Sequence, residues 1–75
     1  LPTTKETAIT CGDQSDYVRL VNESSSVQTV TTVDSNTETP SEMGSVRLQP
    51  GEVMILWKRR EFHRIYASSA EVFGG

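Results

Sequence analysis

The sequence predicts a small all-β domain, a β-sandwich or barrel of about six short antiparallel strands preceded by an extended N-terminal arm. Three observations support this prediction. Short runs of alternating or β-branched residues recur along the chain, and clusters of turn residues separate them. No window keeps a helical repeat over the roughly 11 residues that a helix requires. The 75 residues are enough for one domain only.

The arm is predicted at residues 1–13, which are polar and contain one proline and one glycine, and the β-domain at 14–75. Residues 16–22 alternate, as a half-buried strand does. Val18 and Leu20 fall on one face of that strand. The opposite face carries Tyr17, Arg19 and Val21.

A second strand is predicted at Val27–Asp34, because branched side chains fit a pleated sheet and lose rotamers in a helix. Its valines are spaced by three residues, which indicates either a bulge or a strand with apolar groups on both faces. The polar stretch Ser35–Glu42 is expected to be a loop.

A third strand is predicted at Ser45–Gln49, followed by a tight turn at Pro50-Gly51. Glu52–Lys58 then contains the unbroken apolar run Val-Met-Ile-Leu-Trp. A strand that is apolar on both faces is expected in the middle of a sheet or beneath an interface. Two further strands are predicted at Phe62–Ala67 and Ala70–Phe73.

The residue types needed for catalysis or metal binding are scarce. Cys11 is the only cysteine, so no disulfide forms within the chain, and Cys11 and His63 are the only soft metal ligands, whereas zinc needs four groups. A catalytic Cys–His pair is the alternative to a buried thiol and a histidine on a strand surface. We therefore predict no enzyme activity, no metal and no cofactor.

Charge is distributed unevenly. The net charge of −3 argues against a general nucleic-acid binder. Residues 1–42 are acidic, whereas 43–75 are basic and contain the run Lys58-Arg59-Arg60, with Arg64 beyond it. Such a run can clamp an acidic protein or a phosphate, or it can be a solvated turn. Trp57 is either part of that surface or packed in the core with its neighbours on the same face of the strand.

Three stretches carry a family resemblance: 17–34 (Tyr-Val-Arg-Leu-Val-Asn-Glu-Ser-Ser-Ser onward), 44–58 (with Val-Arg-Leu-Gln-Pro-Gly-Glu) and 65–72 (with Ala-Ser-Ser-Ala-Glu-Val). Together they resemble small virion proteins of tailed bacteriophages, especially those of marine and cyanobacterial phages. The resemblance implies a capsid decoration, or cement, protein: a structural protein of the phage head, made in the host cytoplasm, that binds the major capsid protein and reinforces the shell. A neck or tail accessory subunit is the alternative.

A 75-residue core is marginal, so a partner chain is an expected source of stability, and we expect a homodimer or homotrimer. No run approaches the roughly 20 apolar residues of a membrane span, so no membrane partner is expected. A small cytosolic nucleic-acid-binding module is a further alternative, from a different class. The residues predicted to contact a partner are Leu1, Pro2, Thr3, Thr4, Trp57, Lys58, Arg59, Arg60 and Arg64.

Overall fold

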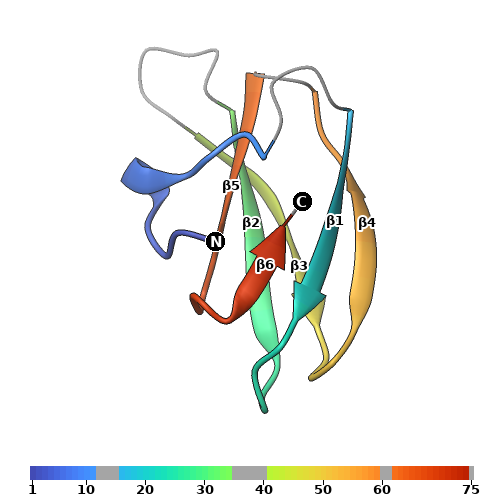
Figure 1. Cartoon of the computed structure of the whole chain (residues 1–75). Helices are drawn as coiled ribbons and strands as arrows, with labels where there is room; N and C mark the ends of the chain where they lie inside the picture. The colour runs from blue at the N-terminus through green and yellow to red at the C-terminus, as the bar shows by residue number, and fades with distance from the viewer. Residues whose placement is uncertain (12–15, 35–40, 60–61, 75) are drawn as a thin grey trace.

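The computed structural model describes residues 1–11, 16–34, 41–59 and 62–74 (Figure 1). A single 3₁₀ turn, η1 (Lys5–Thr7), precedes the strands. The strands, in chain order, are β1 (Tyr17–Asn22), β2 (Gln28–Asp34), β3 (Ser41–Leu48), β4 (Val53–Trp57), β5 (His63–Ala67) and β6 (Val72–Gly74).

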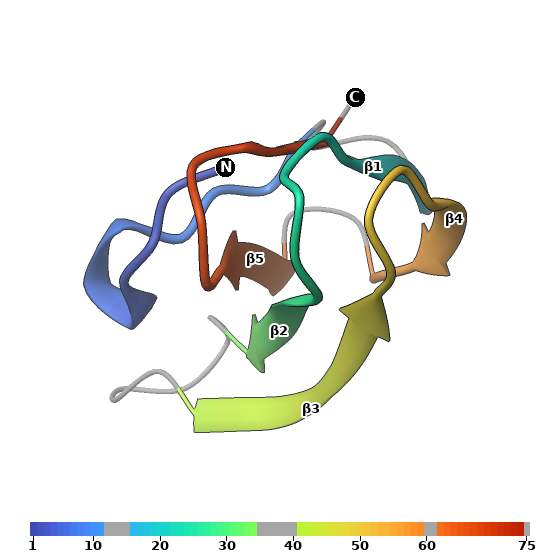
Figure 2. The same ribbon diagram turned by 90° about the horizontal axis from the view of Figure 1, so that it is seen from below.

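These strands form two three-stranded antiparallel sheets, with the orders β4-β1-β6 and β3-β2-β5. The two layers are visible end-on in Figure 2, where β1 and β4 lie on one side and β2 and β3 on the other. The prediction of a small all-β domain is therefore confirmed, with the sandwich as the architecture.

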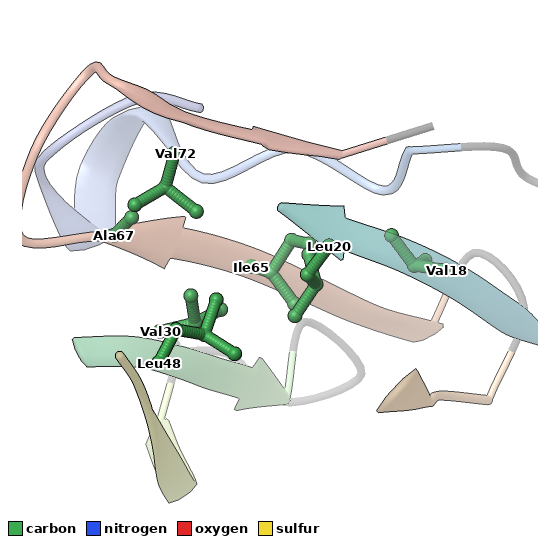
Figure 3. Close-up of a cluster of buried hydrophobic side chains, with 7 residues drawn as sticks. All are labelled: Val18, Leu20, Val30, Leu48, Ile65, Ala67 and Val72. Atoms are coloured by element: carbon green, nitrogen blue, oxygen red, sulfur yellow. The ribbon is translucent and has the colours of Figure 1, made fainter. Parts of the chain in front are cut away.

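The core lies between the two sheets and draws on both of them (Figure 3). Val18 and Leu20 of β1 are completely buried, as their alternation predicts, and face residues from the opposite layer. Burying one such aliphatic side chain contributes roughly 1.5–3 kcal/mol. The buried cluster consists of Val18, Leu20, Val30, Leu48, Ile65, Ala67 and Val72.

The unusual valine spacing of β2 coincides with an irregular ladder. The pairing of β2 with β3 shifts register between Thr32 and Val33, so that Thr32 faces Gly44 while Val33 faces Glu42. Val30 and Val33 are both buried although they differ in parity. The extra residue, Met43, is on β3, whereas β2 pairs with β5 in unbroken register. Val30 belongs to the core cluster and Val33 does not. Of the two predicted alternatives, β2 therefore matches the strand with apolar groups on both faces, and the irregularity belongs to its partner β3. The paired strand β3 begins at Ser41, four residues before the predicted start at Ser45; residues 35–40 of the predicted loop lie outside the described residues.

The turn between β3 and β4 has the predicted form. Gly51 has φ of 79°, and the amide of Glu52 donates to the carbonyl of Gln49 at 2.9 Å. The central position of the apolar run was wrongly predicted, because β4 pairs with β1 alone among the described strands and forms an edge of its sheet. The alternative, that this strand lies beneath an interface, stays a prediction.

Asn22 connects the two sheets at the end of β1. Its side chain is completely buried. The Nδ2 group donates to the carbonyls of Ser26 at 2.8 Å and Leu48 at 3.0 Å. The Oδ1 atom accepts from the backbone amide and the hydroxyl of Ser24, at 3.0 and 2.7 Å. The amide is therefore enclosed and fully used in the folded chain, although Asn22-Glu23-Ser24 matches a glycosylation sequon.

The arm lies along the free edge of β5 (Figure 1). Ile9 and Ile65 exchange two backbone hydrogen bonds, at 2.8 and 3.1 Å, and the amide of Ala67 donates to the carbonyl of Pro2 at 2.9 Å. The backbone nitrogen of Leu1 donates to Val72 at 2.6 Å, and its side chain packs against the core. The arm therefore completes the chain's own sandwich.

Candidate functional site

The outer surface of the β4-β1-β6 sheet carries large apolar side chains that are largely exposed to solvent. Five of them are about half exposed or more: Tyr17 (62%), Ile55 (60%), Trp57 (58%), Phe73 (50%) and Val53 (49%). Isolated exposed apolar residues are ordinary, but a contiguous group of this kind marks an interaction surface. We call these five residues, together with Arg19 and Val21 on the same face, the aromatic face.

The strand register makes this face continuous. Tyr17 lies opposite Trp57, Arg19 opposite Ile55, and Val21 between Val53 and Phe73 on its two neighbouring strands. Side chains directly opposite each other in an antiparallel pair have their Cβ atoms about 4.5–5.5 Å apart. The aromatic face is therefore one patch, with apolar groups at both ends of the sheet and the exposed guanidinium of Arg19 between them.

Lys58 faces inward, against the prediction, whereas Trp57 faces outward, which is one of the two predicted alternatives. Lys58 is completely buried, and Trp57 is exposed. Met54 and Leu56 share the parity of Lys58 and pack against the core. The prediction of an exposed Lys58 is therefore wrong, because this side chain follows Met54 and Leu56 inward. The core alternative for Trp57 is also wrong, because alternation carries Trp57 outward with Val53 and Ile55.

His63 is buried rather than on a strand surface, which corrects the sequence-based default. Its Nδ1 atom accepts a hydrogen bond from the backbone amide of Arg59 at 3.0 Å. Its ring meets that of Trp57 edge to face, with the centroids 5.9 Å apart and an interplanar angle of 82°. The histidine therefore closes the connection after β4 and supports one side of the exposed indole.

The described basic residues of the predicted cluster, Lys58, Arg59 and Arg64, do not form one patch. Arg59 is exposed, and its guanidinium lies over the ring of Phe62, 5.5 Å from the centroid. Arg64 projects from β5 on the outer surface of the other sheet, because its neighbours Ile65 and His63 are buried. Arg60 lies outside the described residues. The predicted clamp is therefore reduced to separate exposed arginines beside a buried lysine.

The four predicted contact residues of the arm divide into two pairs. Leu1 and Pro2 are half-buried against the chain's own strands, whereas Thr3 and Thr4 are exposed. The hydroxyls of Thr4 and Thr7 lie 2.5 Å apart within the 3₁₀ turn. Thr3 and Thr4 are thus exposed to solvent, whereas Leu1 and Pro2 are partly engaged by the chain's own strands.

Cys11 is held against the core in a backbone conformation that is unusual for a side-chain-bearing residue, with φ of 53°. Burial raises the pKa of its thiol, while the N-terminal amine and Lys58 act in the opposite direction. A thiol with a raised pKa is a weak nucleophile near neutral pH. The thiol is therefore partly buried against the core, where a buried one was predicted.

The described residues contain no cluster of three or more potential metal ligands and no pocket. Within the same residues, no helix is long and apolar enough to cross a bilayer. The chemically distinctive feature of the described surface is therefore the aromatic face.

Most of this face could be recognised only after the strands were paired. Alternation in 16–22 already places Tyr17, Arg19 and Val21 on one side of a strand. Phe73 had no signal connecting it to them, since residues 70–73 give no register. The two-sided apolar character of Val53–Trp57 is the sequence feature that indicated an additional surface.

Comparisons with known proteins add no relative. No family model matches the chain, and neither the curated proteins nor the solved structures contain a significant match.

Proposed function

We propose that this chain is a non-enzymatic structural protein of a phage virion, which binds the major capsid protein and reinforces the head shell. The observation that carries the proposal is the aromatic face, an uncovered apolar surface on a rigid sheet. The family resemblance of residues 17–73 supports the choice of partner. A neck or tail accessory role remains the alternative within the virion.

The composition of the aromatic face suits a protein partner. Trp57, Tyr17 and Arg19 belong to the residue types that are enriched at the energetic centres of protein interfaces. A complementary segment of the capsid protein would be a strand or loop that packs apolar side chains against Trp57 and Tyr17. The same segment would place a carboxylate beside Arg19. Arg19 favours a carboxylate because its guanidinium can donate two parallel hydrogen bonds.

The shape of the domain suits a reinforcing role. Binding to a shell needs no cleft, because each copy gains stability by covering apolar surface at its contact with the capsid. Repeated sites on the shell let weak individual contacts act together. The net charge of −3 keeps decorated particles dispersed.

Sedimentation of purified virions tests the proposal directly. We expect the protein in the particle fraction at hundreds of copies per virion, as a shell-coating protein requires. Six or twelve copies per virion would instead assign the protein to the neck or tail. Recovery only in the soluble fraction of infected cells would refute a virion role.

A matched pair of charge reversals tests the aromatic face. Arg19 and Arg47 are both exposed strand arginines, and they lie on the outer surfaces of opposite sheets. In binding to capsids assembled without the protein, we expect Arg19→Glu to weaken binding by about 30-fold, as for an interface hot spot of about 2 kcal/mol. Arg47→Glu is expected to bind normally. Equal loss in both variants would show that net charge, and not this face, determines binding.

A second candidate, a single-stranded nucleic-acid-binding module, is favoured by three exposed aromatic rings and Arg19 on one sheet, since bases stack on such platforms. It predicts quenching of Trp57 fluorescence by single-stranded DNA at low salt, with affinity that falls steeply as salt rises. Unchanged fluorescence at low salt would exclude it.

A further inference from the structure

The four outer strands of the sandwich are protected from edge-to-edge pairing to very different degrees. An unprotected edge offers a row of backbone donors and acceptors to another strand, and natural proteins block it with charges, bulges, short strands or a covering segment. Three of the four edges here carry such a device. The fourth, β4, carries none in the part of the chain that the structure describes.

The protected edges are β5, β6 and β3. The arm covers β5: Ile9 exchanges two backbone hydrogen bonds with Ile65, and the carbonyl of Pro2 accepts one from Ala67. Strand β6 is only three residues long, and the backbone nitrogen of Leu1 occupies its Val72 carbonyl. Strand β3 contains the charged residues Glu42 and Arg47 and the register shift opposite β2.

The β4 edge is apolar, regular and open. Val53–Trp57 contains no charge, proline or glycine. Its ladder with β1 runs in unbroken register over all five positions. No described strand lies beyond it, and it forms the outer margin of the molecule in both Figure 1 and Figure 2.

The hydrogen bonds between β4 and β1 show which backbone groups of β4 point away from β1, toward the open edge. At the two ends of the ladder, the amide of Asn22 donates to the carbonyl of Glu52, and the amide of Lys58 donates to the carbonyl of Asp16. Because hydrogen-bonded positions alternate in an antiparallel pair, the even-numbered residues of β4 bond to β1. The backbone groups of Val53, Ile55 and Trp57 therefore face the open edge.

We propose that β4 pairs antiparallel with β4 of a second copy, about a twofold axis at Ile55. Val53 then lies opposite Trp57 of the second copy, and the outward groups make about six backbone hydrogen bonds. The two sheets become one six-stranded sheet, and the two aromatic faces become one continuous surface. This symmetric contact closes at two copies, as isologous interfaces do.

A second copy fits this edge better than an unrelated strand does, because the central five residues are self-complementary under the twofold axis. Small Val53 meets large Trp57 at both ends, and Ile55 meets itself at the centre. A homodimer also covers apolar area at Val53, Ile55 and Trp57, which are half exposed or more in the single chain.

The contact is small. Two paired five-residue strands bury less than the about 1,200 Å² that marks the lower limit of standard interfaces. We therefore expect a weak, concentration-dependent dimer with a dissociation constant in the range of about 1 to 100 μM. Copies held side by side on a particle would pair readily, because their effective concentration is far higher. The inference concerns the free protein and does not depend on the capsid proposal.

Disulfide trapping tests both the pairing and its register. Paired residues at a hydrogen-bonded position have Cα atoms about 5.5 Å apart, within disulfide range. In a Cys11→Ser background, Ile55→Cys should cross-link to a dimer under mild oxidation. Val53→Cys is the matched control, since it is similarly exposed but lies four residues from its own copy in this register, and it should stay monomeric. If the Val53→Cys variant cross-links and the Ile55→Cys variant does not, the proposed register is wrong.

Sedimentation velocity without any cysteine substitution provides the second measurement. The wild-type chain should shift from monomer to dimer between about 1 μM and about 1 mM. Ile55→Lys places a charge on the exposed side of β4 and should abolish the shift, whereas Ser45→Lys on β3 should preserve it. A wild-type chain that remains monomeric throughout, or an Ile55→Lys chain that still dimerises, would overturn the proposal. Neither result bears on whether the protein is found in virions.

Discussion

Replacing Asn22 with alanine removes the side chain that joins β1 to the end of β3. Asn22 donates to the carbonyls of Ser26, Leu48 and Gln49, and it accepts from the amide and hydroxyl of Ser24. The bond to Leu48 and the two from Ser24 are enclosed, whereas those to Ser26 and Gln49 are only partly buried. Water can replace Asn22 at the partly buried carbonyls more easily than at the enclosed groups.

The expected cost follows from the enclosed groups. Each buried group that loses its partner costs about 1 kcal/mol or more, so Asn22→Ala should lower the free energy of unfolding by about 3 to 4 kcal/mol. A domain of this length has a total stability of about 4 to 11 kcal/mol. The same loss corresponds to a decrease in Tm of about 12 to 32 °C.

Urea unfolding followed by far-UV circular dichroism measures this cost. Fluorescence is less suitable, because Trp57 is already 58% exposed in the folded chain. Ser25→Ala is the control in the same turn, at an exposed position, and should change stability by less than about 0.5 kcal/mol. A loss below about 1 kcal/mol for Asn22→Ala would refute the role assigned to this network.

A shape-matched variant separates hydrogen bonding from packing. Asn22→Asp keeps the acceptor for Ser24 but replaces the donor with a second oxygen facing the carbonyls of Ser26 and Leu48. Its stability should therefore fall as pH rises through the range in which carboxylates ionise, because the unfolded chain accepts the charge more easily than the folded one does. Identical pH dependence in the wild type and the variant would argue against an enclosed amide.

Three further predictions concern single positions. Gly51→Ala should cost about 1 kcal/mol or more in chemical denaturation because φ is 79° there, whereas Gly44→Ala, which has no atom within 4 Å of the new Cβ and no positive φ, should change stability little. Cys11 should react with a thiol reagent at pH 8 more slowly in the folded chain than in urea, since burial raises its pKa; equal rates would contradict its placement against the core. The Tyr66 hydroxyl donates to Glu42 at 2.5 Å, and this bond is the main cause that raises the Tyr66 pKa above 10.0. The contribution of this bond to stability should be lost as pH rises through the raised pKa. Glu42→Gln should lower the Tyr66 pKa in an NMR titration.

Local pattern was sufficient for the strands and for the turn at Pro50-Gly51. Alternation in residues 16–22 correctly separated the two faces of β1, because successive side chains in a strand point to opposite sides whatever lies beside it. The positive φ of Gly51 could also be anticipated, since it depends on the turn itself. The valine spacing of β2 left two alternatives open, and only the pairing with β3 and β5 showed that the extra residue lies on β3.

The direction in which β4 faces could not be obtained in this way. Met54 and Leu56 are as apolar as Val53 and Ile55, so composition does not distinguish the inner side from the outer one. The charge of Lys58 pointed to the wrong choice, because a lysine is almost never fully buried and yet Lys58 is. Packing against the other sheet determined that Met54, Leu56 and Lys58 face inward.

The sequence alone thus determined that the chain is an all-β domain of about six strands, because strand propensity, alternation and turn chemistry act over a few neighbouring residues. Only the tertiary structure decided that Tyr17, Trp57 and Phe73 share one exposed surface, that the arm covers β5, and that the edge of β4 is open. These properties depend on which strands pair and which face meets the core, and both are set by contacts between residues far apart in the chain.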